Sequence, residues 1–250
     1  MMMERYRVLP ESVLKIVAVL SMAIDHVGAA IFLPYCTYLF QTNAPQADTV
    51  YHIYWVIRDI GRLAFPLYCF LLTEGFFHTG NRLKYARNLF AFALLSEIPF
   101  DLALYGKPFY WEGQNVYWTL LFALLGMIVM QKVWETKWQT AGKVVVMGTV
   151  AAGFMALGYV CQTDYDAWGV AAALAMYVLY RFRLIGFAAG VLILFWMAEV
   201  EAYAFLALPL VFLYNGERGR QRKWFYYAFY PVHFLILYAV FQVFKNHMMR

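Results

Sequence analysis

Long apolar runs recur along almost the whole chain, and they constrain its fold more than any other feature. The first covers residues 13–33, and the last covers roughly residues 225–244. A helix needs about 20 residues to cross the hydrocarbon core of a bilayer. The runs are continuous and lack the apolar–polar alternation of half-buried strands. The pattern therefore predicts an all-α, polytopic integral membrane helical bundle.

Composition argues against a soluble fold. Hydrophobic residues make up 64% of the chain and charged residues 14%, with a mean hydropathy of +0.57. Soluble domains are about 45–50% apolar and about 25% charged. The interior of a domain of this size could not cover so much apolar surface, so lipid is the expected solvent.

We expect about nine transmembrane helices in a single domain that comprises residues 1–250. The expected spans are residues 12–33, 53–77, 85–105, 116–134, 142–161, 165–181, 184–198, 201–214 and 225–244. Segments 184–198 and 201–214 are short for a full crossing. Residues 34–52 should form an inserted loop. The first apolar run is longer than the core of a secretory signal, so we interpret it as a retained span.

The charges between the runs predict the orientation, because cytoplasmic loops accumulate Lys and Arg. Basic and non-basic loops alternate at every expected crossing. The basic loops carry Arg5 and Arg7; Arg82, Lys84 and Arg87; Lys132, Lys137 and Lys143; Arg181 and Arg183; and Arg218, Arg220, Arg222 and Lys223. This predicts a cytoplasmic N-terminus in a bacterial-type inner (cytoplasmic) membrane. The net charge of +5 follows from this topology and does not indicate a nucleic-acid partner.

Motifs for metals and nucleotides are missing from the sequence. Cys36, Cys69 and Cys161 lack metal-ligand spacing, and there is no HExxH, CxxC, P-loop or GxSxG motif. We therefore expect no metal. Function is instead indicated by ionisable groups at membrane depth, each of which costs about 2.5–3.5 kcal/mol on insertion scales.

Two histidines at membrane depth are the first candidates. Asp25 and His26 lie deep in the first span, and His233 lies in the middle of the last. A buried histidine often only satisfies a packing contact, but it titrates near neutrality and can act as a general base or proton relay. Adjacent helical residues point about 100° apart, so Asp25 need not orient His26.

Charged residues on two other spans share helix faces. Arg58 and Arg62 are four residues apart, as are Glu97 and Asp101. The arginines, with Asp59, could form internal ion pairs or an anion site. The carboxylates need a cation or shared protons. We expect Glu97 and Asp101 to pair with Arg58 and Arg62.

At these residues the chain resembles the TraX family, membrane proteins linked to N-terminal acetylation of conjugative pilin. The blocks that carry the resemblance are LKIVAVLSMAIDHVGA at residues 14–29, RDIGRLAFPLYCFLLTEGFFHTGN at residues 58–81, SEIPFD at residues 96–101 and YPVH at residues 230–233. RxxGRxAFP and SEIPFD are specific in combination, whereas DH and YPxH are weak alone. The likeness covers nearly the whole chain.

The resemblance implies an acetyltransferase, or a related acyltransferase similar to other multi-span membrane acyltransferases. It would move an acyl group from acetyl-CoA or another acyl-CoA to a peptide N-terminal amine, or to another amine or hydroxyl. In that setting the catalytic residues would be His26 as general base, Asp25 and His233. The substrate-binding residues would be Arg58, Arg62, Glu74, Glu97 and Asp101. The phosphates of CoA would be held by Arg82, Lys84 and Arg87, or by the basic residues of segment 218–223.

Two other functions compete with the enzyme. Buried histidines and carboxylates also suit a proton-coupled transporter, although the halves of the chain show no inverted repeat. A non-catalytic assembly factor for a membrane peptide would use the same residues only to stabilise helix packing. The residues alone do not rank these alternatives, and the resemblance places the enzyme first.

Reporter fusions after Arg250 test the predicted topology. An odd number of crossings separates a cytoplasmic N-terminus from an external C-terminus, so a C-terminal alkaline phosphatase should be active and a C-terminal GFP dark. Fusions in the basic segment at residues 79–84 should show the reverse. A fluorescent GFP after Arg250 would mean that one crossing is wrong.

Overall fold

The computed structural model describes residues 7–220 and 222–248, and this part of the chain is helical apart from turns and two isolated bridges, Leu9–Tyr214 and Gln114–Thr163. The α-helices are α1 (Glu11–Val27), α2 (Leu33–Gln41), α3 (Ala47–Gly61), α4 (Ala64–His78), α5 (Arg82–Tyr105), α6 (Val116–Trp134), α7 (Thr140–Val160), α8 (Asp166–Val178), α9 (Arg183–Met197), α10 (Leu208–Leu213) and α11 (Lys223–Met248). A π-helical turn covers Gly28–Phe32, and 3-10 segments cover Tyr180–Phe182 and Glu199–Ala207. Arg5 and Arg250, which entered the topology prediction, lie outside the described residues.

Seven stretches of helix within the described residues are long and apolar enough to cross a membrane. They are Glu11–Gln41, Ala47–His78, Arg82–Tyr105, Val116–Trp134, Thr140–Val160, Tyr180–Met197 and Trp224–Asn246. A shorter apolar helix, Asp166–Val178, corresponds to the expected span 165–181. The all-helical class is confirmed, whereas the count of nine spans and the cytoplasmic N-terminus stay predictions.

Residues 201–214 do not form the single α-helix that the apolar run predicts. They form the end of the 3-10 segment Glu199–Ala207, followed by the six-residue α10. Pro209 offers a physical reason, because proline lacks an N–H and fits the first turn of a helix better than its interior.

The described chain divides into two compact units. Unit 1 comprises Met1–Phe65, Leu95–Tyr110 and Leu213–Arg250, and unit 2 comprises Pro66–Leu94 and Trp111–Phe212. Helix α5 therefore contributes its first half to unit 2 and its second half to unit 1. The single membrane domain expected from the sequence stays a prediction.

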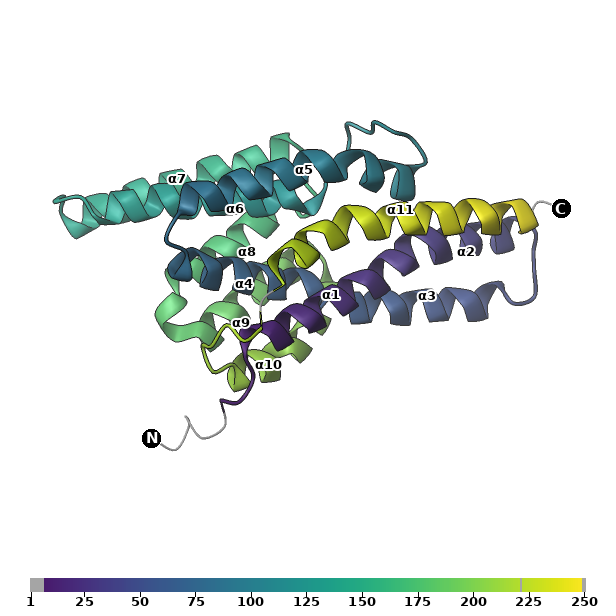
Figure 1. The fold of residues 1–250 in the computed structure, drawn as a ribbon, viewed down its shortest axis with the longest axis horizontal. Helices are drawn as coiled ribbons and strands as arrows, with labels where there is room; N and C mark the ends of the chain where they lie inside the picture. The colour runs from purple at the N-terminus through teal and green to yellow at the C-terminus, as the bar shows by residue number, and fades with distance from the viewer. Residues whose placement is uncertain (1–6, 221, 249–250) are drawn as a thin grey trace. The chain divides into compact units, whose positions relative to one another are not determined.

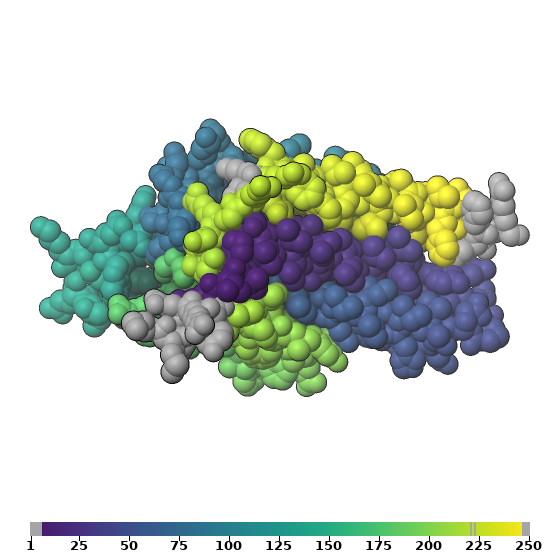
Figure 2. Space-filling model, turned by 60° about the horizontal axis from the view of Figure 1, so that its bottom comes forward, coloured from purple at the N-terminus to yellow at the C-terminus, as the bar shows by residue number. Residues whose placement is uncertain are grey.

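Unit 1 is built on one long helix, Glu11–Gln41, in which α1 continues through the π-helical turn into α2. Helix α1 contacts both α3 and α11, and it lies between them in Figures 1 and 2. Leu14, Ala18 and Met22 are buried and recur every four residues along α1. This spacing gives α1 the continuous apolar stripe that a helix buries against its neighbours.

The prediction of an inserted loop at residues 34–52 is wrong, because most of this segment is helical. Helix α2 covers Leu33–Gln41 and α3 begins at Ala47, so only a short turn joins them. Pro34 was compatible with a loop, but it occupies the first turn of α2, directly after the π-helical turn. A proline is tolerated there because neighbouring backbone can adjust to its missing N–H.

The expected span 53–77 is also two helices. Helix α3 ends at Gly61, α4 starts at Ala64, and the chain turns between them. Pro66 has no N–H to donate to the carbonyl of Arg62, so the hydrogen-bond ladder of α3 cannot continue through this point. Proline is favoured in the first turn of the following helix.

Unit 2 packs α6, α7, α8 and α9 together, and α8 contacts each of the other three. A Cβ added at Gly158 on α7 would lie 2.7 Å from the carbonyl oxygen of Asp166, so glycine permits the close approach of α7 and α8. Asn115 caps α6 by accepting from the Tyr117 amide at 3.1 Å, and its Nδ2 donates to the Ala93 carbonyl on α5 at 2.8 Å.

A buried ion pair joins α4 to α9 within unit 2. Glu74 is fully buried, and its Oε1 lies 2.7 Å from Nε of Arg183. The Arg183 Nη2 donates to Oε2 of Glu74 at 3.1 Å and to the Tyr180 hydroxyl at 3.2 Å. The pair thus combines one charge-assisted hydrogen bond with a second close ion-pair contact. Glu74 is thus paired with Arg183, and its expected role in binding substrate stays a prediction.

Removal of this guanidinium should destabilise the protein. Arg183→Leu leaves the buried Glu74 carboxylate without its guanidinium partner, a change that costs on the order of 3–5 kcal/mol when a buried pair is broken. Arg181→Leu is the matched control, since Arg181 is exposed. Thermal melting of the purified protein in detergent should show a much lower Tm for Arg183→Leu than for Arg181→Leu. Equal melting of the two variants would contradict a structural role for the pair.

Candidate functional site

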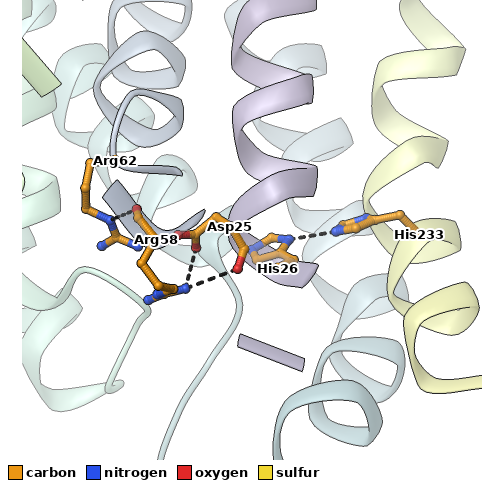
Figure 3. Close-up of polar contacts among 5 residues, drawn as sticks. All are labelled: Asp25, His26, Arg58, Arg62 and His233. Carbon is orange, nitrogen blue, oxygen red and sulfur yellow. Dashed lines mark hydrogen bonds and ion pairs between the residues drawn. The ribbon is translucent and has the colours of Figure 1, made fainter. Parts of the chain in front are cut away.

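Two histidines from the ends of the sequence meet in unit 1. Nδ1 of His26 on α1 lies 2.7 Å from Nε2 of His233 on α11, as Figure 3 shows. Their rings are stacked, with centroids 4.9 Å apart and an interplanar angle of 17°. Both side chains are buried. The two imidazoles that the sequence singled out are therefore brought into direct contact.

The hydrogen bonds of this pair specify its tautomers. Nδ1 of His233 lies 3.0 Å from the carbonyl oxygen of Phe229. A carbonyl oxygen can only accept, so Nδ1 of His233 carries the proton. In a neutral pair Nε2 of His233 is then the acceptor, and Nδ1 of His26 is the donor. The basic lone pair of His26 is consequently left on Nε2.

Aromatic rings of α11 surround the histidine pair. The Phe234 ring lies with its centroid 4.4 Å from that of His26 and 4.3 Å from that of His233. Phe229 stacks on His233 at 5.1 Å, and Tyr230 meets His26 edge-on at 5.9 Å. Apolar rings on several sides lower the local polarity, which strengthens the hydrogen bond between the imidazoles.

Asp25 is bound by two arginines of α3. Nη1 of Arg58 lies 2.7 Å from its Oδ2, and Nη2 of Arg62 lies 2.7 Å from its Oδ1. Arg62 Nε also donates to the carbonyl oxygen of Arg58 at 3.2 Å, as Figure 3 shows. Each carboxylate oxygen thus has its own guanidinium, and α1 is joined to α3 at this level.

His26 and Asp25 therefore serve different neighbours. They are adjacent on α1 and point about 100° apart, so Asp25 reaches α3 while His26 reaches α11. The predicted catalytic role of Asp25 stays a prediction, but Asp25 does not occupy the position beside Nδ1 of His26. Within the described residues His233 occupies that position.

Gly61 is the residue of this site that sequence reasoning missed. A Cβ at Gly61 would collide with Oδ1 and Cβ of Asp25, and a Cβ at Gly28 would lie 2.9 Å from Cγ2 of Ile57. These glycines let α1 and α3 approach closely enough for the ion pairs. The signal was present in the segment Arg58-Asp59-Ile60-Gly61-Arg62, where a glycine stands between the two arginines.

The predicted pairing of Glu97 and Asp101 with Arg58 and Arg62 is wrong for Arg58 and Asp101. Arg58 binds Asp25, and Asp101 accepts a hydrogen bond from the Tyr110 amide at 2.8 Å. Spacing along a helix identifies residues that share a face but does not identify the helix opposite that face. Both carboxylates belong to the part of α5 that lies in unit 1.

Arg82, Lys84 and Arg87, which we expected to hold the phosphates of CoA, lie in unit 2, and the alternative segment 218–223 belongs to unit 1. Arg82 stacks over the Phe76 ring at 4.1 Å from its centroid, and Lys84 and Arg87 are exposed on the first turns of α5. The side chain of Asn81 caps this helix by accepting from the Lys84 amide at 2.8 Å. The role of these cations toward CoA stays a prediction.

Comparisons with known proteins match most of the chain. Residues 11–241 match a family model described as "TraX protein", a range that contains all five residues of Figure 3. A curated protein of Dichelobacter nodosus, described as "Probable fimbrial assembly protein FimC, serogroup H1", is 26% identical over 253 residues, which cover 90% of this chain and 92% of that protein. No solved structure matches the chain.

Gly61→Ala should disrupt the contact between α1 and α3. The added methyl group would overlap the Asp25 carboxylate, so either the ion pairs or the helix packing must give way. Gly153→Ala is the matched control, because a Cβ there meets nothing within 4 Å and alanine is favoured over glycine in a helix by about 1 kcal/mol. Thermal melting should show a clear loss of stability only for Gly61→Ala. Melting of both variants at the wild-type temperature would contradict the close approach.

Proposed function

Because the chain belongs to the TraX protein family, we propose that it is a membrane-embedded acyltransferase that uses acyl-CoA as donor and an amine, such as a peptide N-terminus, as acceptor. The observation that carries the proposal is the hydrogen-bonded pair of His26 and His233. Its tautomers leave one basic nitrogen, Nε2 of His26, in the position of a general base.

The proposed reaction is a direct transfer. Nε2 of His26 removes a proton from the neutral acceptor amine as its nitrogen attacks the thioester carbon. The C–N bond forms, the C–S bond breaks, and the proton on His26 passes to the departing sulfur to give free CoA thiol. His233 accepts a hydrogen bond from Nδ1 of His26, so it stabilises the imidazolium that forms between these two proton transfers. No metal is needed for these steps.

Arg58 is the proposed partner of the thioester oxygen. Its Nη1 binds Asp25, but Nε and Nη2 make no hydrogen bond among the described residues. Asp25 holds the guanidinium in place without using all of its donors. A positioned cation that meets negative charge as it develops on the reacting carbonyl oxygen is among the largest contributions to acyl transfer.

The donor would enter from the cytoplasm, where acyl-CoA is made, which fits the proposed placement in a bacterial inner membrane. Arg82, Lys84 and Arg87 are candidates for its phosphates, because two of the three are exposed beside a capped helix N-terminus. Helix N-termini and cationic side chains both favour phosphate. The acyl group itself is proposed as acetyl by family resemblance.

The name of the Dichelobacter nodosus relative favours a second candidate, a role in assembling a surface fibre. An enzyme that acylates the N-terminus of a fibre subunit would serve such a role. A non-catalytic assembly factor would serve it too, using the buried charges only for packing. The two candidates differ in one property, which is turnover that depends on His26.

Acyl transfer can be measured with the purified protein in lipid nanodiscs. Acetyl-CoA and a panel of peptides with free N-termini should yield CoA thiol and acetylated peptide, detected by a thiol-reactive dye and by mass spectrometry. His26→Ala should lower the rate about 10²- to 10⁴-fold, because it removes the general base. His233→Ala should cause a smaller loss, because His26 Nε2 remains but loses its orienting partner.

His52→Ala is the matched control, since His52 is an exposed histidine of the same unit, and it should retain wild-type turnover. Every variant must elute and melt like the wild type for its rate to count. Full turnover in a folded His26→Ala variant would remove His26 from the mechanism. Peptide binding without turnover by the wild type would favour the non-catalytic assembly factor.

A further inference from the structure

Asp101 is a buried carboxylate for which the proposed reaction has no use. It lies near the C-terminal end of α5, within unit 1, and only 1% of its surface is exposed. Its Oδ2 accepts a hydrogen bond from the Tyr110 amide at 2.8 Å, which holds the carboxylate in one orientation. Its Oδ1 has no hydrogen-bond partner among the described residues.

A buried polar atom without a partner is uncommon and unfavourable, so it calls for an explanation. Among the described residues, no cation pairs with Oδ1 of Asp101. Arg58 is engaged with Asp25. Lys107, the nearest basic residue in the sequence, has its ammonium 5.8 Å from the centroid of the Tyr110 ring and forms no ion pair with Asp101. The oxygen is therefore buried without a cation partner among the described residues.

Aromatic residues neighbour Asp101 along the chain. Tyr105, one helical turn after Asp101, stacks on Tyr110 with centroids 3.9 Å apart and planes 23° apart. Phe100 meets Tyr105 edge-on at 5.9 Å. Aromatic faces attract ammonium and guanidinium groups, as the position of Lys107 over Tyr110 already illustrates. An unpartnered carboxylate oxygen in a segment rich in such rings suits an organic cation better than a metal ion.

The segment that holds Asp101 also packs against an aromatic ring that lies beside the histidine pair. The Phe100 ring packs edge-on against Phe234 at 5.4 Å, and Phe234 in turn lies 4.4 Å from His26 between ring centroids. One layer of aromatic rings thus lies between the Asp101 segment and the imidazoles. A molecule that reaches both places must carry its cation apart from the nitrogen that reacts at His26.

We propose that Asp101, with Tyr105 and Tyr110, binds a positively charged group of the acyl acceptor that is distinct from the acylated nitrogen. This inference rests on the proposed acyltransferase function and gives the acceptor a chemical class, a peptide with an ammonium or guanidinium side chain near its N-terminus. The hydrogen bond from the Tyr110 amide orients the carboxylate before the acceptor arrives. Binding of the cation satisfies Oδ1.

Peptide binding in the absence of acyl-CoA tests the inference apart from catalysis. The probes are Gly-Arg-Gly-amide and Gly-Gly-Arg-amide, each with a twin in which neutral citrulline replaces arginine. Wild-type protein in nanodiscs should bind one of the arginine peptides at least about tenfold more tightly than its twin, because citrulline keeps N–H donors but lacks the positive charge that pairs with the Asp101 carboxylate. Asp101→Asn keeps an acceptor for the Tyr110 amide and should erase this preference.

Asp48→Asn is the matched control, since Asp48 is an exposed acid of unit 1, and it should keep the preference. Equal binding of arginine and citrulline peptides by the wild type would overturn the inference without the use of any variant. A preference that survives in folded Asp101→Asn would also overturn it. An Asp101-dependent preference without CoA release would uphold the cation site and reject the acyltransferase.

Discussion

The contact of one carboxylate with two guanidinium groups is the interaction on which unit 1 depends. Asp25 on α1 would be strongly destabilising at membrane depth if it were alone, because burial removes the water that solvates its charge. Arg58 and Arg62 replace that solvation, each at 2.7 Å and each on a different oxygen. Since the arginines are one turn apart on α3, the three residues also determine how α1 and α3 are aligned along their length.

The ion pairs of Asp25 and the hydrogen bond of His26 involve different neighbours of α1. Asp25 pairs with the two arginines of α3, whereas its neighbour His26 donates a hydrogen bond to the neutral imidazole of His233 on α11. An imidazole partner differs from the aspartate partner of a serine-protease-type triad, since it brings no negative charge of its own. The positive charge that forms on His26 during a proton transfer would be shared with His233 and not neutralised. Tyr230 and Phe234 keep this exchange in an apolar setting.

The sequence predicted the membrane class and all five residues of the central cluster, because both follow from the cost of placing polar groups in lipid. Partners were harder to predict. The i,i+4 spacing of Glu97 and Asp101 indicates a shared helix face. However, Asp101 accepts a hydrogen bond from the Tyr110 amide, and Arg58 forms its ion pair with Asp25. Residues 34–52 contain Asn43 and Pro45, which suggest a loop, yet these residues form only the tip of a helical hairpin. Gly61 was missed because its importance lies in space that only the packed helices define.

The π-helical turn at Gly28–Phe32 begins directly after α1 ends at Val27, two residues after His26. Such a turn holds one residue more than a regular one, so everything beyond it is rotated by about 100° relative to an uninterrupted helix. The face that α2 presents to α3 is therefore set independently of the face that α1 presents to the arginines. In relatives that lose one residue here, the turn would become ordinary α-helix, and α2 would present a different face to α3. The contact between α1 and α11 that pairs His26 with His233 would stay unchanged.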